Sequence, residues 1–227
     1  MPKAQRDLPV IAFRSQSAFD AWLASQPADC RGLWLKIAKK SSGIASVTRS
    51  EAIDAALCHG WIDGQLDSFD GNYWLIRFTP RQSTSKWSEI NRARALELVA
   101  SGLMRPAGQR ELERARKDGR WDAAYAAQST AQVPDDLARA LAKHKRAKAF
   151  FETLDSKNRF AILYRVHDAR KPETRMARIE KFVAMLAEGK TIHPQRPKAP
   201  ERSLKKTLKS RKAQVGRTGN SSRRARA

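Results

Sequence analysis

Apolar residues in the first part of the chain change from helical to extended spacing. The apolar side chains within residues 19–23 follow the i, i+3, i+4 spacing of one helix face, and Ser15 or Ser17 can cap that helix. Apolar positions alternate with other positions over residues 33–37, as in a half-buried strand. This pattern predicts a helix followed by a strand.

A second helix is predicted from a capping box. The hydroxyl group of Thr48 can accept a hydrogen bond from the amide of Glu51 while the Glu51 side chain reaches back to the cap. Gly60 is expected to end this helix, because glycine tolerates the left-handed conformation that a C-terminal cap needs.

A β-hairpin is predicted next. Residues 65–69 and 73–79 are its strands, and Asp70-Gly71 supplies the positive φ angles that a tight turn requires. If the aromatic and aliphatic face of the second strand belongs to the core, Arg77 points to a groove or to solvent.

The chain from position 80 to 194 is predicted to be mainly helical. The expected helix starts are serine caps and first-turn prolines, namely Ser85 or Ser88, Pro106, Pro134, Ser156 and Pro172. Beyond position 194 the periodicity fades into a basic segment with too few apolar groups to offset the entropy of ordering it. These patterns predict an α+β protein with a small antiparallel sheet and helices in its N-terminal part, a mainly helical C-terminal part and a disordered basic tail.

The length and apolar content fit one substantial core, or one core with a smaller lobe, followed by a tail. The chain has 227 residues, of which 41% are hydrophobic. We expect a flexible N-terminus over residues 1–10, an α+β core over residues 11–125, a helical part packed on that core over residues 126–194, and a basic tail over residues 195–227.

Positive charge is concentrated in the tail. The net charge is +22, and residues 195–227 hold 12 basic side chains against 1 acidic side chain. Such an arm attracts nucleic acid or an anionic membrane, although it can also be a solubilising extension without a partner. It has no aromatic residue for base stacking, so binding would be sequence-blind and salt-sensitive. The candidate nucleic-acid-binding residues are Lys205, Lys206, Lys209, Arg211, Lys212, Arg217, Arg223 and Arg224.

Two other basic stretches cover residues 110–120 and 143–148. Acidic residues partly neutralise the first stretch. The sequence favours solvated helix faces for both, and a surface that contacts phosphate groups is the alternative.

The cysteine count and the absence of an export signal indicate an intracellular protein. Two cysteines, Cys30 and Cys58, cannot form a disulfide framework, and the apolar stretch near the N-terminus is too short for a signal peptide. No run approaches 18 consecutive apolar residues, so no transmembrane segment is predicted. We expect a cytoplasmic protein, and the sequence leaves its oligomeric state open.

Polar and aromatic side chains gather between positions 61 and 91. Arginine guanidinium groups beside hydroxyl groups can bind a carboxylate or a phosphate, and the tryptophan rings can stack on a planar group. The alternative is that the acidic residue pairs with an arginine and the tryptophans are core residues that lock the hairpin to the next helix. The candidate ligand-binding residues are Trp61, Asp63, Arg77, Thr79, Arg81, Ser85, Trp87 and Asn91.

The sequence predicts no catalytic residue, no cofactor and no metal site. Cys58 and His59 are adjacent, and neighbouring side chains on a helix diverge by about 100°, so the pair is poorly placed to share a proton. The four histidines lack metal-ligand spacing, and no nucleotide-binding or hydrolase signature is present. A non-enzymatic binding protein is therefore favoured over an enzyme.

Several sequence blocks carry a family resemblance. They are Cys58-His-Gly-Trp-Ile-Asp-Gly-Gln65, Arg77-Phe-Thr-Pro-Arg81, Met104-Arg-Pro-Ala-Gly108, Gly119-Arg-Trp-Asp-Ala-Ala-Tyr125, Asn158-Arg-Phe-Ala-Ile-Leu-Tyr164 and Thr191-Ile-His-Pro194. With them the chain resembles the bacterial YdeI/OmpD-associated family, also called bacteriocin-protection proteins. The resemblance implies an α+β N-terminal part, a helical C-terminal part and a link to stress or bacteriocin resistance.

Two functions are therefore expected. The first is a protection protein without enzymatic activity that binds a small anionic or peptide ligand at the cluster between positions 61 and 91. The second is a non-specific nucleic-acid-associated protein that acts through its basic tail.

Overall fold

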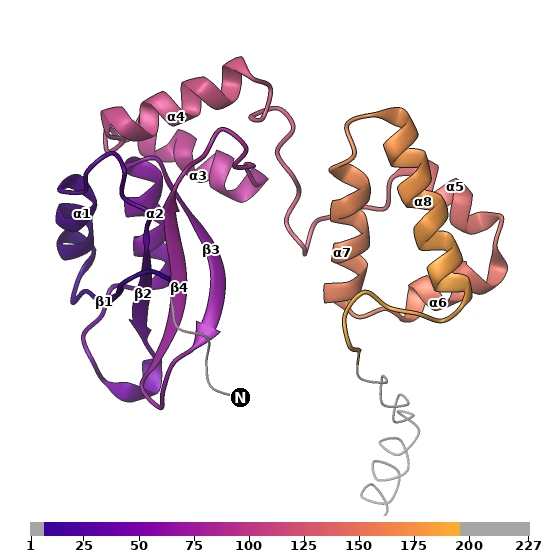
Figure 1. Ribbon diagram of the computed structural model, residues 1–227, viewed down its shortest axis with the longest axis horizontal. Coiled ribbons are helices and arrows are strands. Elements are labelled where there is room, and N and C mark those ends of the chain that lie inside the picture. Colours follow the sequence, from indigo (N-terminus) through magenta and orange to yellow (C-terminus); the bar gives the residue numbers. More distant parts are fainter. Residues whose placement is uncertain (1–6, 196–227) are drawn as a thin grey trace, which may run out of the picture.

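The computed structural model describes residues 7–195 and confirms the α+β class (Figure 1). In chain order the elements are β1 (Val10–Ala12), α1 (Gln16–Ala24), β2 (Leu33–Ala38), the 3-10 helix η1 (Lys40–Ser42), α2 (Arg49–Cys58), β3 (Trp61–Ser68), β4 (Tyr73–Pro80), α3 (Glu89–Ala100), α4 (Pro106–Lys117), α5 (Asp135–Ala142), α6 (Lys145–Thr153), α7 (Ser156–His167) and α8 (Pro172–Ala187). Candidate residues 205–224 of the basic tail lie outside the described part of the chain.

The sheet has the strand order β1-β2-β4-β3. The predicted hairpin is present as β3 and β4, and β4 also pairs antiparallel with β2. The predicted positive φ at Gly71 is wrong, because the Asp70 side chain closes this turn by accepting from the amides of Asn72 and Tyr73. The expectation of a purely antiparallel sheet is corrected at one edge, where β1 pairs parallel to β2. The physical reason is that α1 connects these two strands and lets the chain re-enter the sheet in the same direction. Strand β1 has three residues, too few for a readable alternation.

One face of the sheet is covered by α1 and α2 (Figure 1). Phe19 of α1 meets Phe78 of β4 with ring centroids 5.5 Å apart, and both side chains are fully buried. Ile76 lies on the same face, as the alternation along the second hairpin strand predicts. The other face buries Leu75 against Trp34, so the central strand β4 has apolar contacts on both sides.

The predicted helix ends are confirmed by hydrogen bonds. Ser15 caps α1, and Thr48 and Glu51 form the complete capping box of α2. Ser88 caps α3 through the amide of Asn91. Gly60 follows α2 with φ +74°, in the left-handed region that favours glycine.

A second apolar cluster joins α2, α3 and α4 beside the sheet. It contains Leu57, Trp87, Leu98, Leu112 and Trp121. The two tryptophan rings meet edge to face with centroids 5.0 Å apart. This cluster fixes the loop between β4 and α3 against the segment that follows α4.

Helices α5 to α8 surround a core of their own, shared by Leu137, Phe151, Ile162, Val183 and Leu186. We call residues 7–125 the N-terminal unit and residues 126–195 the C-terminal unit, because no buried residue belongs to the cores of both. The predicted domain boundaries at positions 10, 125 and 194 stay predictions.

Helix α6 was not predicted. Its starting residues are basic, and its apolar residues are confined to positions 147–151, too short a stretch to give a clear helical period. Packing of α6 against α8 in the C-terminal core supplies the stabilisation that the local sequence lacks.

The last described residues are tied back to the C-terminal unit. Asn158 is fully buried, accepts a hydrogen bond from the amide of His193 and donates one to its carbonyl oxygen. Gln195 accepts from the amide of Asp155 and donates to the carbonyl oxygen of Thr153. The position at which the chain enters the basic tail is therefore fixed at the α6–α7 junction. Across residues 7–195, no helix combines the length and the apolar character needed to cross a membrane.

The close approach of α4 to the end of α2 leads to a stability prediction. A Cβ atom at Gly108 would lie 2.4 Å from the carbonyl oxygen of Cys58 and 2.6 Å from that of Leu57. We expect Gly108→Ala to destabilise the N-terminal unit by about 1 to 3 kcal/mol through overpacking. Tryptophan fluorescence during urea denaturation measures this, because all six tryptophans lie between positions 22 and 121.

Gly71→Ala is the matched control, since a Cβ atom there has open space around it. Its effect should stay within about 0.5 kcal/mol. An unchanged denaturation midpoint for Gly108→Ala would contradict the packing of α4 on α2.

Candidate functional site

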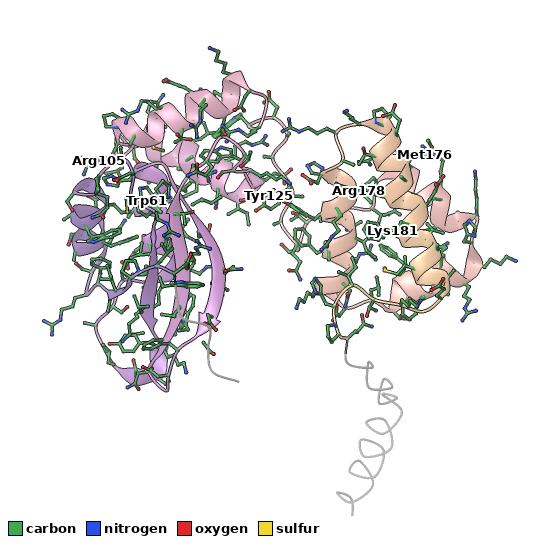
Figure 2. The ribbon with its side chains drawn as sticks, viewed as in Figure 1. Trp61, Arg105, Tyr125, Met176, Arg178 and Lys181 are labelled. Carbon is green, nitrogen blue, oxygen red and sulfur yellow. The ribbon has the colours of Figure 1, made fainter. Side chains whose placement is uncertain are left out.

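The predicted site residues at the start of the hairpin lie apart from one another. Trp61 is 5% exposed and meets Trp22 edge to face in the first core. Figure 2 shows Trp61 inside the N-terminal unit and Tyr125 near the segment that joins the two units. Trp61 is therefore a core residue, and its ring face is unavailable for stacking on a ligand.

Two predicted residues on the sheet form ion pairs. Asp63 lies 3.5 Å from Nη2 of Arg49, and Arg77 donates to the carboxylate of Asp7 at 3.2 Å. Thr79 is half-buried on β4, where its backbone pairs with β3. These residues face different partners, and the structure does not bring them into one cavity.

Arg81 and Trp87 do come together. The guanidinium of Arg81 lies 3.7 Å from the ring centroid of Trp87, and the two residues are 4% and 2% exposed. Nη1 of Arg81 donates to the carbonyl oxygen of Lys86, while Nε and Nη2 have no hydrogen-bond partner among the described residues. Burial lowers the pKa of Arg81 to about 10, and the carboxylates of Glu111 and Asp63 offset part of this effect.

Ser85 and Asn91 take part in hydrogen bonds with backbone groups of the same segment. The Ser85 hydroxyl accepts from the amide of Gln82, and the Ser85 carbonyl accepts from Nη1 of Arg120 at 2.7 Å. The backbone amide of Asn91 completes the N-terminal cap of α3. Arg120, which is 6% exposed, also lies 2.8 Å from the Asp118 carboxylate. The loop of residues 81–88 is thus held by two buried arginines.

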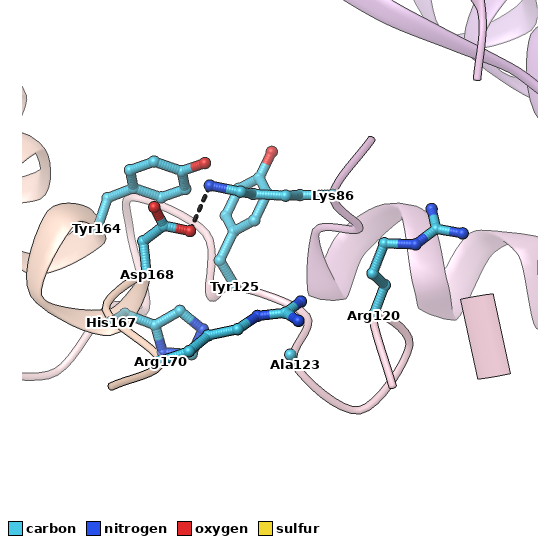
Figure 3. Close-up of a pocket in the computed structure, with 8 residues that line it drawn as sticks. All are labelled: Lys86, Arg120, Ala123, Tyr125, Tyr164, His167, Asp168 and Arg170. Carbon is cyan, nitrogen blue, oxygen red and sulfur yellow. Dashed lines mark hydrogen bonds and ion pairs between the residues drawn. The ribbon is translucent and has the colours of Figure 1, made fainter. Parts of the chain in front are cut away.

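A small cavity of about 100 Å³ lies next to this loop, between the two units (Figure 3). It is lined by Lys86, Arg120, Ala123 and Tyr125 of the N-terminal unit and by Tyr164, His167, Asp168 and Arg170 of the C-terminal unit. Figure 3 shows the Arg170 side chain extending toward Ala123, below the pair formed by Lys86 and Asp168.

Polar and aromatic contacts join the units at this cavity. The ammonium of Lys86 donates to Asp168 and lies 5.2 Å from the ring centroid of Tyr164. The rings of Tyr125 and Tyr164 meet edge to face with centroids 5.0 Å apart. Although burial opposes it, hydrogen bonding to Asp168 and Tyr164 raises the pKa of Lys86. Burial raises the pKa of Tyr125, and the nearby Tyr164 adds to the shift.

The cavity carries a positive charge. Lys86, Arg120 and Arg170 are cationic; Lys86 pairs with the lining carboxylate Asp168, and Arg120 pairs with Asp118. Asp168 also lies 3.6 Å from Nη1 of Arg178, so two cations share it. No ion pair is recorded for Arg170 within residues 7–195. A carboxylate or phosphate group matches these donors in charge and in geometry.

Sequence reasoning found the loop beside the cavity and missed the opposite wall. Ser85 and Trp87 flank Lys86, whereas the sequence predicts a helix and a family resemblance for residues 158–164 but no site residue there. Residues 164–170 lie some 80 positions away from Lys86 in sequence. No local spacing signals that a helix so distant closes the site.

Cys58 and His59 do not form a nucleophile and base pair. Nε2 of His59 lies 2.9 Å from the Asp20 carboxylate. Burial raises the pKa of the Cys58 thiol, and Asp20 and Asp54 add to the shift. A buried thiol with a raised pKa is protonated at neutral pH and is a poor nucleophile.

The contrast between the two buried arginines gives a second prediction. The pKa of Arg81 is lower in the folded chain than in the unfolded chain, so its charge opposes folding at every pH below about 10. We expect Arg81→Met to leave the free energy of unfolding within about 1 kcal/mol, or to raise it. Arg120→Met should lower it by about 1 to 3 kcal/mol, because the Ser85 carbonyl and Asp118 lose their donor.

Urea denaturation followed by circular dichroism at pH 7 compares these two variants. A loss for Arg81→Met as large as that for Arg120→Met would contradict this assignment of roles.

Two family models match separate segments of the chain. Residues 11–111, from β1 into α4, match a model described as a domain of unknown function (DUF8412). Residues 130–189, which hold α5 to α8, match the model described as bacteriocin-protection, YdeI or OmpD-associated. No curated protein and no solved structure gave a significant match.

The sequence blocks that resemble the family are distributed over both matched segments. The block at residues 158–164 falls in the YdeI/OmpD-associated segment, and those at residues 58–65 and 77–81 fall in the other one. The cavity draws Lys86 from the first segment and Tyr164 from the second. The segment of residues 130–189 is therefore similar to the YdeI/OmpD-associated, bacteriocin-protection family, in agreement with the resemblance of the sequence blocks.

Proposed function

We propose that this protein is a non-enzymatic stress or bacteriocin-protection protein that binds a small anionic ligand in the cavity between its two units. The observation that carries the proposal is the composition of the cavity wall. Three cationic residues and two tyrosines line the cavity, and because Lys86 pairs with Asp168 and Arg120 pairs with Asp118, Arg170 is the lining cation for which residues 7–195 show no ion pair. Anions are the ligands that such a wall attracts.

The size of the cavity limits what can enter. About 100 Å³ admits one phosphate- or carboxylate-sized group. Arg170 supplies a planar fork of donors, and the rings of Tyr125 and Tyr164 offer apolar surface to the neighbouring part of the ligand. A peptide would place an acidic side chain or its terminal carboxylate in the cavity, with the rest of the peptide outside.

The ligand joins surfaces that belong to different units. Lys86, Arg120 and Tyr125 are fixed by the N-terminal unit, while Tyr164 and Arg170 belong to the C-terminal unit. An anion that contacts both sides adds attraction between them and stabilises their present arrangement. Ligand binding would then change how strongly the two units are held together.

The reduced cysteines fit a cytoplasmic site of action. Cys30 and Cys58 are both unpaired in the structure. Cytosolic proteins keep their thiols reduced, whereas secreted domains commonly use them in disulfides.

Inorganic phosphate is the probe that tests the cavity. We expect millimolar phosphate to raise the melting temperature of the wild-type chain at constant ionic strength. Arg170→Gln should weaken phosphate binding about tenfold, because it removes a charged donor worth about 1.4 kcal/mol. Isothermal titration calorimetry measures the dissociation constant directly.

Arg165→Gln is the matched control. Arg165 is exposed on α7, whereas Arg170 follows the end of that helix, and the Arg165 guanidinium donates to the Ala161 carbonyl. It removes one positive charge without touching the cavity wall. Equal phosphate binding by wild type and both variants, or no binding by wild type, would refute the proposed site.

A further inference from the structure

A second, smaller hollow adjoins the cavity of about 100 Å³ around Arg170, which we call the anion cavity. The second hollow has a volume of about 70 Å³ and shares three lining residues with the anion cavity, namely Tyr125, Tyr164 and His167. We call it the apolar chamber. Its other lining residues belong to α7 and to the segment that leads into α5, and they are Ala126, Ala131, Gln132, Pro134, Phe160 and Leu163.

One face of α7 forms the wall that the two hollows have in common. The i, i+3, i+4, i+7 spacing places four side chains on this face, Phe160, Leu163, Tyr164 and His167. The first two line the apolar chamber alone, and the last two line both hollows. Figure 3 shows the last two on the α7 side of the anion cavity. The hollows therefore follow one another along the helix, about one turn of 5.4 Å apart.

The lining of the apolar chamber differs in chemistry from that of the anion cavity. Leu163 is 4% exposed and belongs to the core of the C-terminal unit. Phe160 lies against Tyr164, with ring centroids 5.9 Å apart. No lysine, arginine, aspartate or glutamate is found among the described residues that line the chamber. A ligand therefore gains affinity by burying apolar atoms there.

The volume of the chamber limits the apolar group to a short chain. A cavity of about 150 Å³ with apolar walls can hold benzene. The chamber has about 70 Å³, which is too little for a ring of that size. A methylene group takes up roughly as much room as a water molecule, about 30 Å³, so the chamber holds about two or three carbons.

We propose that the anion cavity and the apolar chamber together bind one small amphiphilic anion, a carboxylate or phosphate monoester with an alkyl chain of about three to five carbons. The charged group binds Arg170, so the inference rests on the proposed function for this end of the ligand. The chain runs along Tyr164 and His167 and ends against Leu163. The charged group supplies the attraction to the site, and the chain distinguishes this ligand from a free inorganic anion.

The two ends of such a ligand contact the protein differently. Apart from Tyr125, the residues that line the chamber lie in the C-terminal unit. The anion cavity takes Lys86 and Arg120 from the N-terminal unit and Arg170 from the C-terminal unit. The alkyl chain therefore binds mainly one unit, whereas the charged group links that unit to the other.

Isothermal titration calorimetry of the full chain with two series of ligands tests the inference at constant ionic strength. The first series is inorganic phosphate followed by methyl, propyl, butyl and hexyl phosphate, and the second is acetate, butyrate and hexanoate. The dissociation constant should fall about three- to fourfold for each buried methylene group and level off near the butyl chain. Phenyl phosphate should bind less tightly than butyl phosphate. The series that binds more tightly identifies the charged group.

The variant Ala126→Leu is designed to fill the apolar chamber. It should raise the dissociation constant of butyl phosphate about tenfold or more and leave that of inorganic phosphate within about twofold of the wild-type value. Ala177→Leu is the matched control, because Ala177 is exposed on α8 and lines neither hollow. Ala131→Leu changes a second lining alanine and should act like Ala126→Leu. The wild-type series needs no variant and decides the inference even where a substitution disturbs the fold.

Two outcomes separate this inference from the proposed function. Equal affinity for inorganic and butyl phosphate, with binding that Arg170→Gln weakens, overturns the inference and leaves the anion cavity in place. No binding of any member of either series overturns both. A chain-length dependence that persists in Ala126→Leu and Ala131→Leu places the alkyl chain elsewhere and also overturns the inference.

Discussion

The two units of this protein meet through polar and aromatic side chains instead of a shared apolar core. Lys86 and Asp168 form a charged contact, and Tyr125 and Tyr164 pack edge to face beside it. A contact of this kind contributes far less stability than apolar burial. The cores on either side therefore determine the fold of each unit.

Within the N-terminal unit, two buried arginines hold the loop that reaches this junction. Arg81 stacks on Trp87, and Arg120 neutralises Asp118 while donating to the Ser85 carbonyl. Because Arg81 donates to the Lys86 carbonyl and Arg120 to the Ser85 carbonyl, the backbone on which Lys86 lies is held by hydrogen bonds. The cavity wall thus combines this loop of the N-terminal unit with α7 and the residues that follow it in the C-terminal unit.

Charge is used differently along the chain. On α4 and around Arg81, acids and carbonyl groups accompany the cations, so these residues help to hold the fold. At the start of α6, Lys145, Arg146 and Lys148 have no such partners among residues 7–195 and oppose the helix dipole. Basic residues therefore have two physical roles in this chain. The contacts of each residue distinguish the two roles, whereas the net charge does not.

The sequence by itself determined the α+β class, the hairpin and the helix ends at Ser15, Thr48 and Ser88, because caps and alternation act over a few residues. It also predicted that the loop of residues 81–88 contributes to a site. It did not determine the parallel strand β1 or helix α6, whose short or basic sequences are stabilised by distant packing.

Only the tertiary structure decided the site. It buried Trp61 and Trp87 and directed Asp63 and Arg77 to separate ion pairs. The cavity itself joins Lys86 to Tyr164 and Arg170. The physical reason is that a site between two units is made by contacts between residues far apart in sequence, and local periodicity carries no information about such contacts.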